Sequence, residues 1–207
     1  SGSTWTVVVT FSASSAGAQS STLTLSYNDG AGAQTSSRAV QATAANPASL
    51  SVSDGATYDF GTLANGATLE KTFTITNGGN FTASSMGGSG LSAPLTFKGG
   101  SYPGTGGSCG GSLNASATCT VVVVFAPTVA GANSQTMSIG YNDGAATQSA
   151  TRPVQGTGAN PASLAVSDGA TYNFGTKATG ASAEKTFTVT NSGAVTATSM
   201  SGSGLSA

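Results

Sequence analysis

The residues most able to do chemistry are the only two cysteines, Cys109 and Cys119, which lie ten residues apart. A disulfide between them would close a small loop and constrain the unfolded chain, which stabilises the fold by roughly 2–3 kcal/mol. One alternative is a redox pair, but the sequence has no Cys-x-x-Cys spacing. The other is a metal site, for which there is no histidine and only two thiols. We predict a structural disulfide and an oxidising compartment.

Aspartates in glycine-containing turns are the candidate calcium ligands. Tyr-Asn-Asp-Gly and Ser-Asp-Gly each occur twice, and their carboxylates belong to Asp29, Asp54, Asp143 and Asp168. Calcium sites gather several carboxylates, whereas each of these turns offers one. Asn and Asp before Gly also favour tight hairpin turns. We therefore predict turns at these positions, with no metal site and no cofactor.

The composition gives little support to catalysis. Serine is abundant, but no histidine is present to activate one, and charged residues make up only 6% of the chain. The net charge of −1 indicates no binding surface for nucleic acid or anionic lipid. No apolar run approaches the roughly 20 residues that span a bilayer, so we expect no membrane span here. We predict a protein that is not an enzyme, with any export signal outside these residues.

Two lysines fall on the inward face of a predicted strand, Lys71 and Lys185. In some surface fibres such a lysine is crosslinked to an Asn or Asp side chain. The only acidic neighbour that we identify is Glu70, which points to the opposite face. We interpret Lys71 as a lysine at the start of a strand whose ammonium group reaches solvent.

The elements that would position these residues follow an internal repeat. The segment 46–62 returns at 160–176 with two substitutions, an offset of 114 residues. Repeats of this kind indicate a tandem array of similar units. We predict three parts: the C-terminal part of a preceding repeat at 1–45, a complete repeat at 46–159 and the N-terminal part of a following repeat at 160–207.

Apolar and polar residues alternate along most of the repeat, as in half-buried strands. In the strongest candidate strand, 119–125, comparison of the copies indicates the buried face. Val124 corresponds to Thr10, so that side should meet water. The opposite side is preserved: Val121, Val123 and Phe125 return as Val7, Val9 and Phe11. About seven such strands per repeat, separated by turn residues, predict an all-β chain of immunoglobulin-like β-sandwiches.

Three motifs mark the complete repeat. They are Tyr58-Asp-Phe-Gly-Thr62 followed by Lys71-Thr-Phe-Thr-Ile-Thr-Asn77, the segment from Cys109 to Cys119 that runs into Thr120-Val-Val-Val-Val-Phe-Ala-Pro127, and the closing Val154-Gln-Gly-Thr-Gly158. Together they resemble the bacterial choice-of-anchor D domains and, more distantly, the Hydin-like immunoglobulin domains. The resemblance implies an exported, modular protein of the cell surface or extracellular matrix, and it brings no catalytic residues.

The junctions between repeats are short. Their residues are Ala45, Asn46 and Pro47 at the first junction and Gly158, Ala159, Asn160 and Pro161 at the second. A proline and so few residues leave little slack, so we expect consecutive domains to be held end to end. We predict a structural repeat segment of an exported fibre, stalk or adhesin. It would act as a spacer for a tip whose host or matrix ligand lies outside this chain.

Two other functions remain open. A glycan-binding module would use the glycine-rich loop 99–114, whose exposed aromatic residue would be Tyr102. A filament subunit would assemble from neighbouring copies of itself, because the terminal parts 1–45 and 160–207 lack only the equivalents of 94–114 between them. Each part has fewer than 50 residues, too few to bury an adequate core alone. We expect the two parts to complete one sandwich, head to tail, within one long polypeptide, which we favour, or between chains that share strands.

Overall fold

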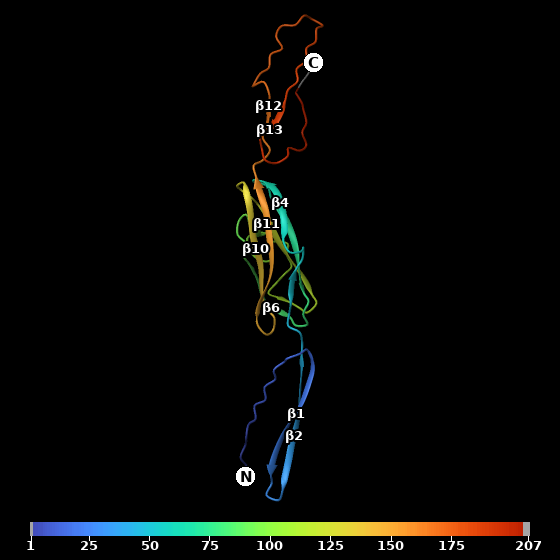
Figure 1. The fold of residues 1–207 in the computed structure, drawn as a ribbon, viewed down its shortest axis with the longest axis vertical. Helices are drawn as coiled ribbons and strands as arrows, with labels where there is room; N and C mark the ends of the chain where they lie inside the picture. Colours follow the sequence, from blue (N-terminus) through green and yellow to red (C-terminus); the bar gives the residue numbers. More distant parts are fainter. Residues whose placement is uncertain (1, 205–207) are drawn as a thin grey trace.

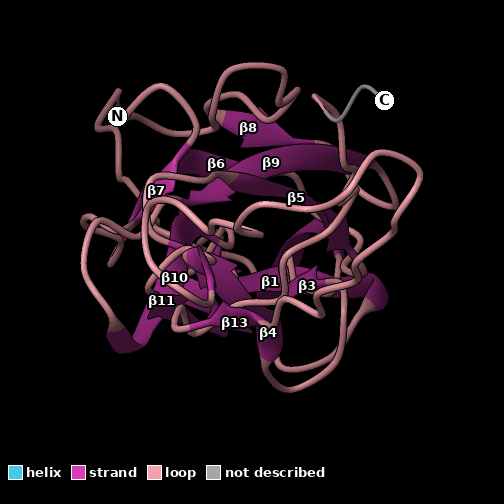
Figure 2. Ribbon diagram, turned by 90° about the horizontal axis from the view of Figure 1, so that it is seen from above, coloured by secondary structure: helices cyan, strands magenta, loops and turns pink. Residues whose placement is uncertain are grey.

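The computed structural model describes residues 2–204. Residue 1 and residues 205–207, at the outer ends of the predicted 1–45 and 160–207 parts, lie outside the described residues. Three groups of strands follow one another in single file along a rod (Figure 1). Seen along this rod, the described chain consists of strands and loops (Figure 2). No helix among these residues is long and apolar enough to cross a membrane.

The middle group is a sandwich of nine strands. Their bounds are Leu50–Val52 (β3), Tyr58–Ala64 (β4), Leu69–Asn77 (β5), Ala83–Ser89 (β6), Leu95–Phe97 (β7), Ser112–Leu113 (β8), Thr118–Phe125 (β9), Gly131–Asn142 (β10) and Thr147–Ala159 (β11). One sheet has the order β3-β5-β9-β7 and is antiparallel throughout. The other has the order β4-β11-β10-β6-β8, in which only β4 and β11 run parallel. The predicted all-β, immunoglobulin-like sandwich is confirmed.

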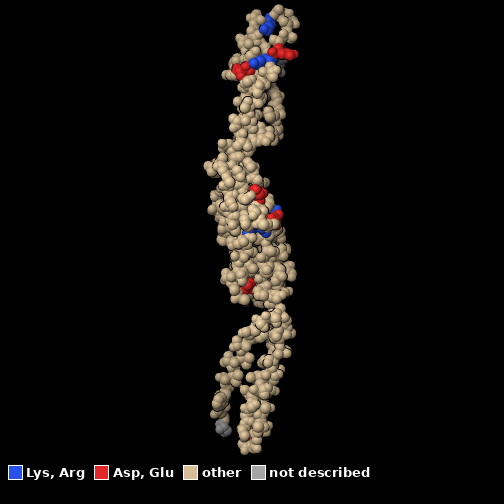
Figure 3. Space-filling view, in the orientation of Figure 1, with Lys and Arg blue, Asp and Glu red and all other residues tan. Residues whose placement is uncertain are grey.

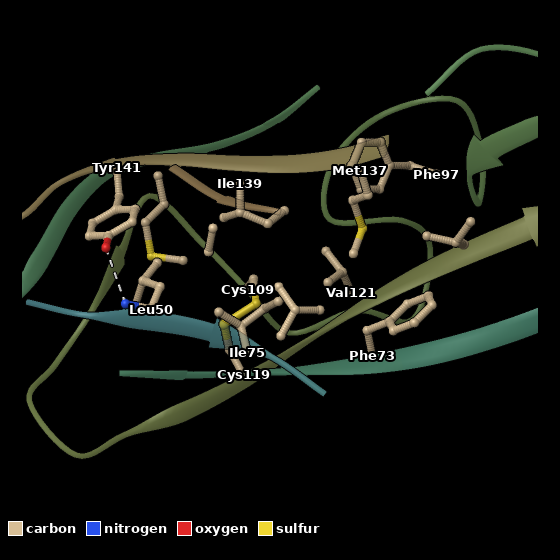
Figure 4. Packing of buried hydrophobic residues seen from close by; sticks show 14 of the residues in the cluster. Leu50, Phe73, Ile75, Phe97, Cys109, Cys119, Val121, Met137, Ile139 and Tyr141 are labelled. Carbon is tan, nitrogen blue, oxygen red and sulfur yellow. Dashed lines mark hydrogen bonds between the residues drawn. A yellow bond between two sulfur atoms is a disulfide. The ribbon is translucent and has the colours of Figure 1, made fainter. Parts of the chain in front are cut away.

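The core lies between the two sheets and is built from alternate residues of the central strands (Figure 4). On β9 the predicted inward row is confirmed, because Val121, Val123 and Phe125 are fully buried. Phe73 on β5 and Ile139 on β10 are also fully buried. Each such side chain contributes about 1.5–3 kcal/mol through burial.

The outer face of β9 is more covered than the alternation predicts. Val122 is buried although it points away from the core. The glycine-rich loop that follows β7 lies across it: Lys98 N donates to Val122 O (2.9 Å) and Val122 N donates to Pro103 O (2.9 Å). The expectation that this side meets water is therefore wrong at Val122, while Val124 is half-buried.

The terminal groups are smaller. At one end of the sandwich, β1 (Gly17–Asn28) and β2 (Ala33–Ala44) form an antiparallel hairpin. At the other end, β12 (Leu164–Val166) pairs with β13 (Val189–Asn191), also antiparallel. The β1–β2 hairpin has the register of β10–β11 shifted by 114 residues. Among the described residues neither terminal group has a second sheet packed on it, and both leave large apolar side chains exposed.

Candidate functional site

The first junction is fastened to the sandwich by hydrogen bonds from the turn after β5. Asn77 is fully buried, and its Oδ1 accepts hydrogen bonds from Ser49 N (3.1 Å) and Gly79 N (3.0 Å). Asn80 N donates to Asn46 O (3.1 Å). The chain is thus held in place within a few residues of leaving the preceding part.

The amide nitrogen of Asn77 joins two further segments to the same point. Asn77 Nδ2 lies within hydrogen-bond distance of Phe81 O (2.9 Å), Leu113 O (3.1 Å) and Asn114 O (3.2 Å). A buried amide is stable only when both of its ends are paired, and here both are. The sequence analysis missed this residue. Its one signal was the recurrence of an asparagine at the end of the same strand, at Asn191.

At the second junction two adjacent residues are hydrogen-bonded to different parts of the chain. Asn65 N donates to Ala159 O (2.8 Å), which binds Ala159 to the sandwich. The next residue, Asn160, accepts from Ala194 N (3.0 Å) in the following part. At the first junction only Ala45 lies between the end of β2 and the bonded carbonyl of Asn46.

The residues predicted for the junctions lie at the two ends of the sandwich (Figure 1): Ala45, Asn46, Pro47, Gly158, Ala159, Asn160 and Pro161. Gly158 packs tightly, because a Cβ there would lie 2.8 Å from the Cβ of Pro127. The Asn65 amide, oriented so that both its ends are paired, donates to Val129 O (3.0 Å) and accepts from Ala130 N (3.1 Å). These contacts fix the backbone from which the second junction leaves.

The predicted disulfide is present in the structure. Cys109 and Cys119 are bonded, with their Cα atoms 4.9 Å apart and both side chains buried. Cys119 pairs with Ile75 across β9 and β5, so the bond ties the long loop to the centre of one sheet (Figure 4). No cysteine among the described residues is free.

Lys71 has a different partner from the one considered in the sequence. Its Nζ lies 2.6 Å from Asp54 Oδ1 and 4.8 Å from the ring centroid of Tyr58. The statement that Glu70 is its only acidic neighbour is wrong, because the turn after β3 brings Asp54 across from 17 residues away. The hydrogen bond from Lys71, and next that from Ser53, lowers the pKa of Asp54. As a partly exposed ion pair, this contact contributes about 0.2–1 kcal/mol.

Asp29 and Asp143, two of the four candidate calcium ligands, accept hydrogen bonds within their own turns. Asp54 and Asp168 instead pair with Lys71 and Lys185. Asp143 accepts from Ala145 N and Ala146 N, each at 2.7 Å, and the bond from Ala146 is the main cause of its lowered pKa. Among residues 2–204 no group of three acidic, cysteine or histidine side chains could hold a metal ion. Charged side chains are sparse on the face drawn in Figure 3, where no basic patch is seen.

Tyr102 is not the free aromatic residue that glycan binding would require. It is half-buried, and its ring meets Phe97 edge to face with centroids 5.9 Å apart. Its hydroxyl donates to Gly110 O (3.1 Å). The ring therefore helps to hold the glycine-rich loop on the sandwich, and the prediction that it is exposed is wrong.

Comparison with known proteins identifies the central sandwich. A family model described as HYDIN/CFA65/VesB-like, Ig-like domain matches residues 48–157. Three solved structures are similar. The VesB protease of Vibrio cholerae has 16% sequence identity and a TM-score of 0.43, and the match covers 54% of this chain and 32% of that chain. The ASH/PapD-like domain 7 of human CEP192 has 17% identity and a TM-score of 0.39, with 56% of this chain and 88% of that chain covered. A Porphyromonas gingivalis W83 protein of unknown function has 16% identity and a TM-score of 0.40, with 69% of this chain and 67% of that chain covered. The chain spans about a third of the VesB protease chain. No curated protein matches significantly.

Removal of the disulfide by the double substitution Cys109→Ala/Cys119→Ala should lower the free energy of unfolding by about 2–3 kcal/mol, because the unfolded chain regains the freedom of this loop. Guanidinium titration followed by circular dichroism measures the loss. Wild-type protein in reductant serves as the matched control and should unfold at the same guanidinium concentration as the variant. Equal midpoints for the oxidised wild type and the variant would contradict a stabilising role.

Substitution of Gly79 by alanine should destabilise the first junction. A Cβ at Gly79 would overlap the backbone of Pro47 and Ala48, so the junction must shift, at a cost of about 1–3 kcal/mol. Gly78→Ala is the matched control, since a Cβ there would lie 3.8 Å from Ser49 O, an ordinary contact. Denaturant titration measures the free energy of unfolding of the two variants. Equal values would contradict the role of Gly79 in holding the first junction.

Proposed function

The chain belongs to the HYDIN/CFA65/VesB-like Ig-like domain family, and on this premise we propose that it is a structural repeat segment of an exported bacterial surface protein. In this role it resembles the choice-of-anchor D domains and acts as a spacer in a fibre, stalk or adhesin. The segment 46–159 is one unit, and 1–45 and 160–207 belong to its neighbours. A ligand of host or matrix origin binds at a tip outside this chain.

The observation that carries the proposal is the second junction, where adjacent residues are bonded to different units. Ala159 O accepts from Asn65 N in the sandwich, and Asn160 O accepts from Ala194 N in the following part. A flexible linker needs several unpaired residues, and none lies between these two bonded carbonyls. A junction of this kind restricts the orientation of one unit relative to the next, which a spacer requires.

An extracellular location agrees with two properties of the chain. The disulfide between Cys109 and Cys119 persists in oxidising compartments and is rare in the reducing cytosol. Charged residues form only 6% of the sequence, and its polar positions are filled largely by hydroxyl and amide side chains. Neither property supplies catalytic groups, which favours a mechanical role over an enzymatic one.

The spacer proposal predicts a stiff, elongated chain in dilute solution. A compact globule of this length would have a radius of gyration of about 17 Å, and small-angle X-ray scattering should give a value well above it. Insertion of Gly-Ser-Gly-Ser between Ala159 and Asn160 should broaden the distribution of interatomic distances, because it separates the two bonded carbonyls.

The matched control carries the same insertion between Gly55 and Ala56, in an exposed turn of the sandwich. This variant adds the same residues outside the junctions, so its distribution of interatomic distances should match that of the wild type. A radius near the compact value, or the same profile for both insertions, would count against a stiff spacer.

A further inference from the structure

Each sheet of the sandwich ends in strands that have a neighbour on one side only. These edge strands are β3 and β7 in one sheet, and β4 and β8 in the other. The outward N–H and C=O groups of an edge strand can pair with a strand of another molecule, so natural β-sheet proteins protect them. Repeat proteins are especially prone to such misassembly, because neighbouring units have similar sequences. The sandwich therefore needs protection at all of these edges.

The backbone of β3 has groups that point away from its neighbour β5. Ser53 N donates to Thr74 O in β5 (3.0 Å). Along an antiparallel pair, residues that bond to the neighbouring strand alternate with residues that do not. The backbone groups of Leu50 and Val52 therefore point to the free side of β3.

Two side chains of the opposite sheet bond to these outward groups. The hydroxyl of Tyr141, on β10, accepts a hydrogen bond from Leu50 N (3.2 Å; Figure 4). Arg152, on β11, donates from Nη2 to Val52 O. Each side chain thus takes the place that the backbone of an added strand would occupy.

These contacts belong to the interior of the sandwich. Tyr141 is only 7% exposed and Arg152 only 8%. The turn between β10 and β11 adds a backbone bond beside them, since Ala48 N donates to Asp143 O (2.9 Å). The free side of β3 is therefore joined to the other sheet along its length.

Arginine is a costly residue for position 152. The Nε of Arg152 is buried and has no hydrogen-bond partner among residues 2–204. Burial of a charged side chain is unfavourable unless its donors are paired. An apolar side chain of similar length would fill the same space without this cost. What the arginine adds is its bond to Val52 O.

The other edge of this sheet is covered by the glycine-rich loop. β7 has only three residues, so β9 extends beyond it. In that part of β9, Val122 N donates to Pro103 O (2.9 Å). Thr120 N donates to the hydroxyl of Ser108 (3.0 Å). The loop that contributes both acceptors is fixed to β9 by the disulfide.

The edges of the second sheet are short or irregular. β8 has only two residues. β4 is longer, but its pairing with β11 changes register between Gln155 and Thr157. Opposite this shift, Gly61 has a φ of 74° and its N–H donates to Asp59 Oδ1 (2.7 Å). A bulge of this kind bends an edge strand and prevents continuous pairing with another strand.

We propose that these contacts close the sandwich to strand addition, so that rows of units do not pair side by side. Tyr141 and Arg152 protect β3, and the glycine-rich loop protects β9. The partner that they exclude is an edge strand of a second copy of this chain. The inference goes beyond the spacer role, because it concerns contacts between chains and not distance along one chain.

The test removes the protection of β3 in the full chain. The Tyr141→Phe/Arg152→Met variant loses the hydroxyl and the guanidinium but keeps side chains of similar size, so the outward groups of β3 become available. Two identical edges that pair with each other form a closed dimer. At the same high concentration, sedimentation equilibrium should therefore give the variant a weight-average mass about twofold that of the wild type.

Two controls separate edge pairing from other effects. Tyr27→Phe/Arg38→Met makes the same substitutions in the β1–β2 hairpin, on which no second sheet lies among residues 2–204. Ile139→Val destabilises the sandwich from its fully buried centre without changing an edge. Both controls should have the mass of the wild type.

Amide exchange followed by NMR shows whether β3 itself pairs. In dilute solution, the Leu50 amide of the Tyr141→Phe/Arg152→Met variant should exchange faster than in the wild type, because its acceptor is gone. At high concentration its exchange should slow, because a strand of the second copy then accepts this N–H.

The inference is overturned if the variant has the mass of the wild type at every concentration, or if Ile139→Val associates to the same extent. It is also overturned if the mass rises while the Leu50 amide stays unprotected, since association then occurs elsewhere. A compact radius of gyration in scattering would count against the spacer but would change none of these outcomes, so the two proposals fail separately.

Discussion

A β-sheet with one apolar face needs a second sheet to cover that face, and the rest of this structure depends on that requirement. In the sandwich the requirement is met, because Phe73, Val123 and Ile139 from three different strands are all fully buried between the sheets. The alternation of apolar and polar residues places these side chains on one face of each strand. In the terminal groups, which have no second sheet among residues 2–204, residues of the same type are exposed to solvent.

The same requirement determines how much of the structure could be predicted. Alternation and the comparison of copies identified the inward row of β9, since a buried position keeps its apolar residue while Val124 becomes Thr10. Features that depend on contacts distant in sequence could not be derived from alternation, and the recurrence of Asn77 as Asn191 does not by itself say what the side chain binds. The pairing of Lys71 with Asp54, the burial of Asn77 and the loop that covers Val122 each arise from segments brought together only by folding.

The spacer role that we propose depends on the two junctions. Asn77, which is buried at the end of β5, holds the first junction through a hydrogen bond from Ser49 N. At the second junction the consecutive carbonyls of Ala159 and Asn160 are both hydrogen-bonded, so no unpaired residue lies between them. Charged residues are few, and no group of three potential metal ligands is present among residues 2–204, so the described surface offers mainly shape and hydrogen bonding. A chain built in this way is suited to the role that we propose for it, which is to set distance and direction between other parts of a protein.

Amide hydrogen exchange followed by mass spectrometry tests the central claim most directly. Amides in β5, β9 and β10, which lie in sheets covered by a second sheet, should exchange only through global unfolding of the sandwich. Their counterparts in residues 4–11 and 183–191, on which no second sheet lies among the described residues, should exchange rapidly. Rapid exchange throughout β5, β9 and β10, or terminal amides as well protected as those of the sandwich, would contradict the account.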